Sequence, residues 1–355
     1  MDKCMLAGCD LHDKTMLLKL AVGRAAATKR SFSNDSEGRR AMSAELKQRA
    51  LAAGAARIVL AYEASGLGFN LHDELAAQGF TCHVLAPSKI ERSPKHRSSK
   101  TDEKDATRIL EILRGHYLAG NALPAVWIPD QQTRDDREVV RARLDAQDKC
   151  VALKTQIRTL LKRNGVEKPA GLGASWTREY RAWVAALSTC DEPLAWGARQ
   201  HLASLLRQME SLEAEVQALE RSVGELATQP RHAKQVEQIT KLKGVGVLSA
   251  MVFLVEMGNP ERFANRRQVG AFVGLVPSSA ESGETSDKKG HITHQGPARL
   301  RYILCQAVWN RVRGDPDEKA VYERIVARNP KHKKIAVVAA MRRLAIRMWH
   351  LTKAA

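Results

Sequence analysis

The sequence predicts an α/β domain at the amino terminus, a helical middle region and a mainly α-helical carboxyl-terminal domain. Up to about residue 130, short apolar runs alternate with helical stretches after an opening pair of neighbouring runs, which indicates a mixed sheet. From residue 131 onward, apolar residues instead recur at helical spacing. Because 355 residues exceed the usual size of one domain, we divide the chain into units 1–130, 131–235 and 236–355.

The first unit opens with two apolar runs separated by the polar turn LHDK, which suits antiparallel neighbours in a sheet. Two later apolar runs, at 57–62 and 80–85, are bounded by glycine or proline and predict further strands, and the stretches around them predict helices. A third strand next to the opening pair, at 28–32, is also expected. The expected strands are 3–10, 15–22, 28–32, 57–62 and 80–85, and the expected helices are 36–53 and 70–78.

The end of the first unit combines a loop, a helix and a short extended piece. Residues 88–104 are polar and basic, which predicts a loop. Thr101 is a favourable N-cap for a helix over 102–114, and 126–128 is expected to close the domain as a last extended segment.

The middle unit contains two helical stretches around an irregular insert at 165–196. The first stretch covers 131–162. In the second, apolar residues are spaced alternately three and four apart, a heptad seam that predicts a coiled coil. The stripe fits a seam between two protomers or an antiparallel hairpin with 131–162 equally well. Its members are Leu202, Leu205, Met209, Leu212, Val216, Leu219, Val223 and Leu226.

The third unit begins with a glycine-containing turn between two helical stretches, resembling a helix-hairpin-helix turn. Lys243, Gly244 and Gly246 lie in it, and glycines let backbone amides approach a phosphate at a helix start. The same residues also suit a tight turn between helices that binds nothing. The turn is therefore a candidate nucleic-acid contact with an equally simple structural interpretation.

The charge balance favours a polyanionic partner. The chain has 57 Lys and Arg against 39 Asp and Glu, a formal charge of +18. Nucleic acid is the first candidate because Lys and Arg neutralise phosphates, and an anionic membrane surface is the rival. About half of such residues normally serve as solvated helix faces. The candidate phosphate contacts in the third unit are Arg299, Arg301, Arg311, Arg313, Lys333, Lys334, Arg342 and Arg343.

The sequence predicts a cytoplasmic protein without a membrane partner. It contains no apolar run of the roughly 18 residues that a spanning helix needs, and its first residues lack the regions of a signal peptide. The six cysteines lie far apart without a C-x-x-C pair, so we expect reduced thiols.

Four acids form the most informative pattern in the chain. Asp10 and Glu63 end two expected strands, so adjacent strands would place both carboxylates at one sheet edge. Asp102 and Asp105 are three residues apart and share one face of the following helix. Carboxylates gathered this closely favour a divalent cation, and Mg²⁺ or Mn²⁺ takes such oxygen ligands.

Each acid also has a simpler interpretation. Asp102 and Asp105 lie in the first turn of a helix, where the helix dipole favours negative charge. Asp10 and Glu63 each precede a turn, where acids are common. The metal hypothesis depends on all four occurring together in α/β order within a basic chain.

Two sets of motifs resemble one known family. The first set comprises Cys9-Asp10, Tyr62 to Gly66, and Lys100 to Ala106, and it is similar to the DEDD motif of a RuvC-like, RNase H-fold domain. The second set comprises GLVP at 274–277, ESG at 281–283 and the segment 290–301. Together they resemble the DEDD-type insertion-sequence transposases, a family that includes pilin-gene invertases.

The resemblance implies DNA transposition or site-specific recombination. In this family Asp10, Glu63, Asp102 and Asp105 would hold Mg²⁺, and Ser282 would form a 5′-phosphoserine link to DNA. A structured bridge RNA would guide the reaction to the element ends and target, and the bacterial protein would act at the nucleoid as a homodimer or homotetramer. The acids and the serine of one active site can come from different protomers in this family.

The catalytic role of Ser282 is supported by the resemblance alone. A serine in the polar stretch SSAESGETSDKK is otherwise typical of a surface loop, because its hydroxyl needs an activating base or metal. The alternative function is a metal-dependent, structure-selective DNA nuclease, similar to a junction resolvase, in which Ser282 has no chemical role.

Overall fold

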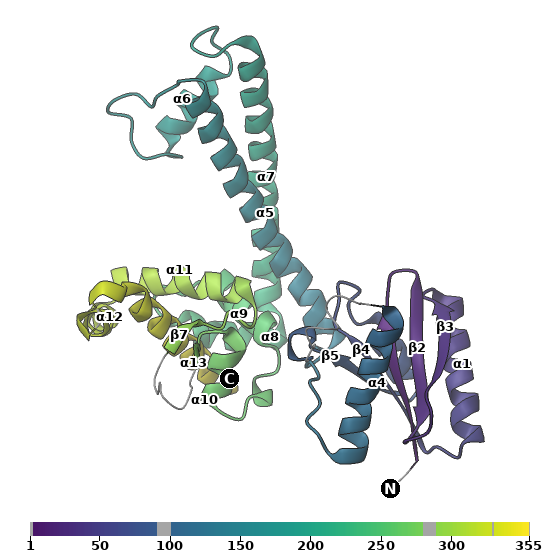
Figure 1. Cartoon of the computed structure of the whole chain (residues 1–355). Coiled ribbons are helices and arrows are strands. Elements are labelled where there is room, and N and C mark those ends of the chain that lie inside the picture. Colours follow the sequence, from purple (N-terminus) through teal and green to yellow (C-terminus); the bar gives the residue numbers. More distant parts are fainter. Residues whose placement is uncertain (1–2, 91–100, 280–288, 329, 355) are drawn as a thin grey trace. The chain divides into compact units, whose positions relative to one another are not determined.

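The computed structural model describes residues 3–90, 101–279, 289–328 and 330–354. The chain forms two compact units, Met1–Ile128 and Pro129–Ala355 (Figure 1). The first is an α/β domain, and the second is almost entirely helical. The further division expected between residues 235 and 236 stays a prediction.

The first unit is built on a five-stranded mixed sheet with the order β3-β2-β1-β4-β5. β1 pairs antiparallel with β2, and β2 pairs antiparallel with β3, as the short turns between them require. β4 adds parallel to β1, and β5 adds parallel to β4, through crossover helices. The strands are β1 Cys4–Leu11, β2 Thr15–Val22, β3 Thr28–Ser33, β4 Arg57–Glu63 and β5 Thr81–Leu85.

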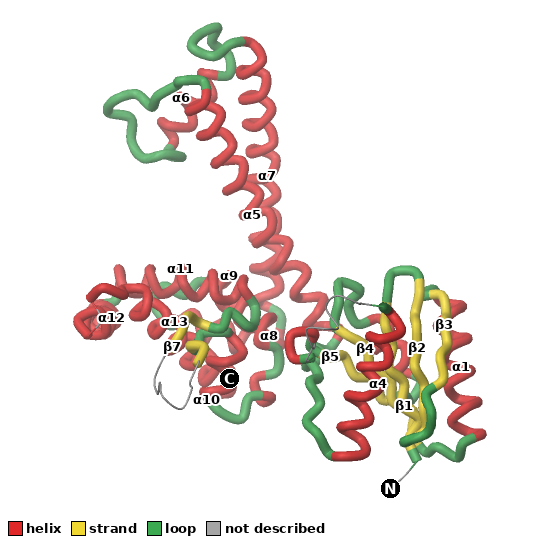
Figure 2. Tube along the Cα trace, in the orientation of Figure 1, coloured by secondary structure: helices red, strands yellow, loops and turns green. Residues whose placement is uncertain are grey.

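Helices cover both faces of this sheet (Figure 2). α1 (Ser36–Ala52) and α2 (Asn70–Ala77) pack on one face, and α4 (Asp102–Ala119) packs on the other. The expected mixed α/β sheet is confirmed. The segment expected to close the domain at 126–128 pairs with β5 only locally, through a bridge between Ala125 and Leu85 and a hydrogen bond from the Val126 nitrogen to the Val84 oxygen at 2.8 Å.

The second unit begins with two long helices that pack against each other. They are α5 (Gln131–Arg163) and α7 (Trp196–Thr228), which lie side by side in Figure 1. Leu202 and Leu205 share one apolar cluster with residues of α5, and Val223 and Leu226 share another. Much of the heptad stripe is therefore buried within the chain. The insert at 165–196, expected to be irregular, contains the helix α6 (Arg178–Leu187).

The rest of the second unit packs helices around one apolar core. Phe253, Leu300 and Trp349 contribute to this core from three different helices. A two-stranded antiparallel hairpin of β6 and β7 is part of the same region. The elements are α8 Pro230–Thr240, α9 Val247–Met257, α10 Arg266–Val273, β6 Pro277–Ser279, β7 Lys289–Ile292, α11 Ala298–Gly314, α12 Pro316–Arg328 and α13 Lys333–Ala354, with 3-10 turns at Pro87–Lys89, Pro260–Arg262 and Pro330–His332.

Candidate metal centre

Asp10 and Glu63 end neighbouring parallel strands. Cys9 on β1 lies opposite Tyr62 on β4, so the next residues on the two strands are Asp10 and Glu63. Successive side chains on a strand point to opposite faces of the sheet. Because Cys9 and Tyr62 belong to the cluster beneath α1 and α2, Asp10 and Glu63 lie on the opposite face, which α4 covers.

Gly8 allows α4 to approach this face closely. A Cβ atom at Gly8 would collide with the backbone carbonyl oxygen of Ala106 and the backbone nitrogen of Leu110. Only glycine therefore permits α4 to cross β1 at this height. Since Asp10 lies two residues farther along the same face, the close crossing brings the first turn of α4 near its carboxylate.

The first turn of α4 is fixed at both its cap and its side. Thr101 caps the helix by accepting a hydrogen bond from the backbone nitrogen of Lys104 at 3.4 Å. Glu103 accepts hydrogen bonds from Lys19 Nζ at 2.6 Å and from Lys29 Nζ at 2.9 Å. These two bonds to β2 and β3 lower the pKa of Glu103 to about 2. The helix start that carries Asp102 is thereby tied to the sheet.

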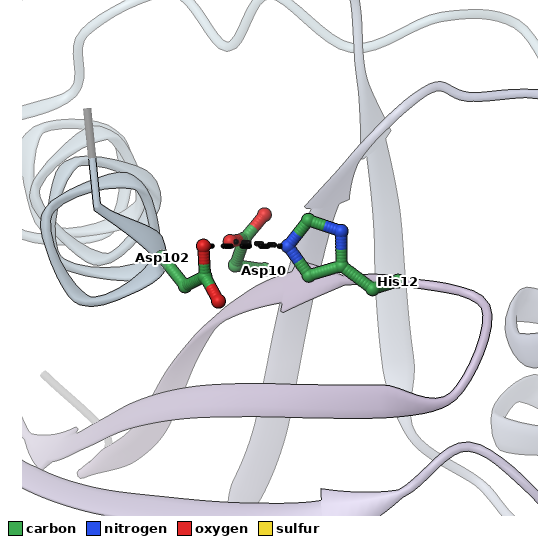
Figure 3. Close-up of side chains that lie close together, drawn as sticks. All are labelled: Asp10, His12 and Asp102. Atoms are coloured by element: carbon green, nitrogen blue, oxygen red, sulfur yellow. Dashed lines mark hydrogen bonds and ion pairs between the residues drawn. The ribbon is translucent and has the colours of Figure 1, made fainter.

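Three side chains converge at this point: Asp10, His12 and Asp102 (Figure 3). His12 Nε2 lies 3.1 Å from Asp10 Oδ2 and 3.6 Å from Asp102 Oδ1. One ligand atom from each of the three residues lies within 4.8 Å of the others. The Asp10 side chain is 17% exposed and the Asp102 side chain 58%, so the group is open on the side of the helix.

The electrostatics of Asp10 favour a cation. Burial raises the pKa of Asp10, and His12 opposes this rise through its charge and its hydrogen bond. The nearby charges of Asp102 and Asp105 raise the pKa further. An ionised Asp10 therefore costs free energy unless positive charge is close, and a divalent ion would remove that cost.

The structure brings only some of the five predicted catalytic residues together. Asp10 and Asp102 meet with His12, and Asp105 is near enough to influence the pKa of Asp10. Glu63 ends the neighbouring strand, but neither Glu63 nor Asp105 contributes an atom to the three-residue group. Ser282 lies outside the described residues.

Sequence reasoning missed His12, which it treated as part of a polar turn. A signal was present, because His12 follows Asp10 by two residues and extended backbone places such residues on one face. The alternation of Asp10 and His12 at a strand end could have suggested a pair of ligands.

Comparisons with known proteins identify a family for the chain. Residues 7–164 match the DEDD transposase model of IS110, and residues 236–323 match the model of the transposase IS116/IS110/IS902 family. The protein y4rJ of Sinorhizobium fredii, assigned as a transposase, is 30% identical over 296 residues, which are 80% of this chain and 73% of y4rJ. The chain belongs to the IS110 family of transposases.

Other members of the IS110 family match in the same way. The protein y4qE of Sinorhizobium fredii, also assigned as a transposase, is 30% identical over 71% of this chain and 58% of its own length. The transposase for insertion sequence element IS1533 of Leptospira borgpetersenii is 24% identical over 70% of this chain and 69% of its own length. The family supports a DNA substrate and divalent metal use.

A pocket of about 690 Å³ adjoins the candidate metal centre. Residues 11–15 line one part of it, and Ser65, Gly66 and Leu67 line another. His12 thus contributes to both the pocket and the three-residue group. Lys14 adds a positive charge to the lining, so the pocket combines an acidic edge with a basic residue.

The predicted basic contacts fall into two groups. Arg311 is buried, donates to Glu318 at 2.6 Å and donates to the backbone oxygen of Lys243 at 2.8 Å. Arg299 pairs with Asp145 at 2.6 Å. Arg311 is therefore a structural residue that supports the turn before α9, and its guanidinium is engaged with a carboxylate.

The second group faces solvent. Lys243, Gly244 and Gly246 are exposed in the turn between α8 and α9. Among the other predicted contacts, Arg313, Lys333, Lys334 and Arg343 are exposed. Arg301 and Arg342 are half-buried, and Arg301 donates to the backbone oxygens of Val273 and Gly296. Within the part of the chain that the structure describes, no helix is both long and apolar enough to cross a bilayer.

Proposed function

We propose that this protein is the transposase of an insertion sequence and that it cleaves and rejoins DNA at a metal centre in its first unit. One observation carries the proposal: Asp10 from the end of β1 and Asp102 from the first turn of α4 meet at one point, in a chain of the IS110 family. Far-separated carboxylates converge in this way where a divalent ion binds nucleic acid.

The donor set fits Mg²⁺ or Mn²⁺. Asp10 and Asp102 would hold the ion, and Glu63 and Asp105 lie on the adjacent strand and helix turn where they could complete the site. When bound, such an ion activates a nucleophile and neutralises charge on the leaving oxygen. Gly8, Thr101 and Glu103 position the site, because they fix the start of α4 against the sheet.

DNA is the proposed substrate and partner. The net charge of +18 supports strong, salt-dependent attraction to phosphates. Lys14 beside the candidate metal centre and the exposed turn at Lys243, Gly244 and Gly246 are proposed phosphate contacts.

The proposed chemistry passes through a 5′-phosphoserine. The Ser282 hydroxyl oxygen attacks the scissile phosphorus, the bond from phosphorus to the 3′ oxygen breaks, and the released 3′ oxygen takes up a proton. In the reverse step a 3′ hydroxyl attacks the phosphoserine, which restores the serine and joins the strands. The number of phosphoester bonds is unchanged throughout, so the exchange needs no nucleotide hydrolysis. The family resemblance supports this role for Ser282.

Guidance by a structured bridge RNA and assembly into a homodimer or homotetramer complete the proposal. The family resemblance supports both. RNA would be bound through its shape and backbone, while base pairing would select the DNA.

The deciding experiment incubates the full chain with labelled element-end DNA, its non-coding flanking RNA and Mg²⁺. We expect a protein-linked DNA product on denaturing gels that Ser282→Ala and Asp10→Asn both abolish. Asp13→Asn is the matched control, because Asp13 lies three residues after Asp10, is exposed and does not contribute to the three-residue group.

Three outcomes separate the alternatives. Cleavage with free 5′ phosphates and no adduct would replace the proposal with a nuclease of the resolvase type. Unchanged cleavage in Asp10→Asn would reject the metal centre. Unchanged target choice after altering the RNA sequence would reject guidance.

A further inference from the structure

His12 lies at the metal centre although the acidic pattern gives it no role. It follows the last residue of β1, and its Nε2 lies 3.1 Å from Asp10 Oδ2 and 3.6 Å from Asp102 Oδ1. Figure 3 shows the imidazole edge directed between the two carboxylates. A ring nitrogen in this position is a potential third ligand.

We propose that His12 Nε2 is a ligand of the ion held by Asp10 and Asp102, and that this nitrogen shifts the preference of the centre from Mg²⁺ toward Mn²⁺. The inference rests on the proposed function in one respect: it assumes that the centre binds a divalent ion.

The spacing of the donor atoms fits a single ion. Two neighbouring ligands at about 2.1 Å from one octahedral ion are roughly 3.0 Å apart, and two opposite ligands are roughly 4.2 Å apart. The distances from His12 to Asp10 and Asp102, 3.1 and 3.6 Å, lie within or close to this range. Small side-chain rotations would therefore suffice to bring all three donors to one ion.

The backbone of His12 is held in place on both sides. Its nitrogen donates to the carbonyl oxygen of Thr15 at 2.9 Å, and its carbonyl oxygen accepts from Asn34 Nδ2 at 2.7 Å. The nitrogen of Asn34 donates in turn to the carbonyl oxygen of Lys14 at 2.9 Å. These hydrogen bonds fix the turn against the residues that precede α1. Less conformational entropy is therefore lost when the His12 imidazole binds an ion.

The chemistry of imidazole explains the shift in metal preference. Mg²⁺ takes oxygen ligands almost exclusively, whereas first-row transition ions accept imidazole nitrogen readily. Any such centre binds Mn²⁺ at least as well as Mg²⁺. The informative quantity is therefore the change in the ratio of the two affinities when His12 is replaced.

A simpler role for His12 would be to orient Asp10 through a hydrogen bond. In that case the ring stays outside the coordination shell, and the bound ion contacts only oxygen. The two roles differ in a spectroscopic signature, because a directly coordinated ¹⁴N nucleus shares spin density with Mn²⁺ and couples to it far more strongly than an uncoordinated one.

The experiment loads the full-length protein with Mn²⁺ and records electron spin echo modulation, together with separate Mn²⁺ and Mg²⁺ titrations. The variants are His12→Asn, His12→Asp and the control His72→Asn, whose imidazole lies on α2 beside Asp73. Circular dichroism establishes that each variant is folded.

We expect ¹⁴N coupling in the wild-type protein and in His72→Asn, and none in His12→Asn. Mn²⁺ affinity should fall by roughly 10-fold or more in His12→Asn. In His12→Asp we expect the ratio of Mn²⁺ to Mg²⁺ affinity to fall while Mg²⁺ binding is kept.

Coupling that is missing in the wild-type protein, or that persists in His12→Asn, would overturn the assignment of His12. An unchanged affinity ratio in His12→Asp would overturn the role in metal preference. Wild-type protein that binds no Mn²⁺ at all would instead reject the metal centre of the proposed function.

Discussion

The two faces of the amino-terminal sheet use adjacent residues for opposite purposes. On the face beneath α1 and α2, Cys9 and Tyr62 are completely buried. One residue farther along the same strands, Asp10 and Glu63 lie on the α4 face and are only partly buried. A step of one residue therefore separates core from candidate site, because side chains alternate along a strand.

Titration behaviour separates the faces in the same way. Burial raises the pKa of the Cys9 thiol far above its usual value and raises that of Cys82 to about 12. These two buried thiols are therefore uncharged at neutral pH. On the α4 face, burial raises the pKa of Asp10, so its ionised form carries a cost that a bound cation would relieve. The difference teaches that both faces carry apolar core, but that at the ends of β1 and β4 only the α4 face carries acids.

The largest difference in DNA cleavage should appear between substitutions of two neighbouring residues of β1, Asp10 and Cys9. We expect Asp10→Asn to lower DNA cleavage by roughly 10²- to 10³-fold or more, the scale seen when one electrostatic contributor to a transition state is removed. Cys9→Ala should leave the cleavage rate nearly unchanged and lower the free energy of unfolding by about 1 kcal/mol.

Denaturant unfolding of the metal-free proteins sharpens this contrast. Asp10→Asn should raise the free energy of unfolding by roughly 0.5–2 kcal/mol, because it removes a charge that the fold disfavours. Abolished cleavage in Cys9→Ala, or a destabilised metal-free fold in Asp10→Asn, would contradict the assignment of Cys9 to the core and Asp10 to the site.

A second prediction concerns how α4 reaches the sheet. Gly8→Ala should lower the free energy of unfolding by roughly 1–3 kcal/mol, because the new Cβ meets the backbone of α4 and forces it outward. Mn²⁺ affinity should fall with it, since Asp102 moves with the helix. Calorimetric titration measures that affinity.

Gly224→Ala is the matched control for this change. A Cβ at Gly224, within α7, meets no atom within 4 Å, so the same substitution should be neutral or stabilise by up to about 1 kcal/mol. Equal metal affinity in Gly8→Ala and the wild-type protein would show that the close crossing does not position Asp102.

The core face can be probed through its thiols. At pH 8 we expect Cys190, which is exposed, to react rapidly with a thiol reagent, and Cys9 and Cys82 to react only on unfolding. Cys190→Ser should remove the fast phase. Fast reaction of Cys9 in the native protein would mean that this face opens and is not a stable core.

The smallest effect is expected at Glu103. Its pKa is lowered from 4.5 to about 2 by Lys19 and Lys29, so its contribution to stability is present above about pH 4.5 and is lost as the pH falls toward 2. The melting temperature of Glu103→Gln should therefore lie slightly below that of the wild-type protein at pH 6 and converge with it near pH 2. A difference that grows on acidification would contradict this sign.

Local patterns predicted much of the first unit. The apolar runs predicted β1 and β4 because burial on both faces demands continuous hydrophobic sequence, whereas β3 is a mostly exposed edge strand without such a run. Thr101 marked the start of α4 because a hydroxyl cap is a local feature. The pairing of the short segment at 126–128 was less predictable, because its bridge to the end of β5 joins residues far apart in the sequence.

The candidate site was predictable only in part. Asp10 and Asp102 followed from acids at element ends, whereas the convergence of His12 with them depends on a turn stapled by Asn34. The role of Arg311 was hidden for a similar reason, because its partner Glu318 lies beyond a helix break. Such contacts depend on tertiary packing, which periodicity does not report.

The most direct test of the metal centre is anomalous diffraction from crystals of the full-length protein soaked in Mn²⁺. We expect an anomalous peak within about 2.2 Å of carboxylate oxygens of both Asp10 and Asp102. A map at saturating Mn²⁺ with no peak between these two residues, or with peaks only elsewhere on the chain, would contradict the account.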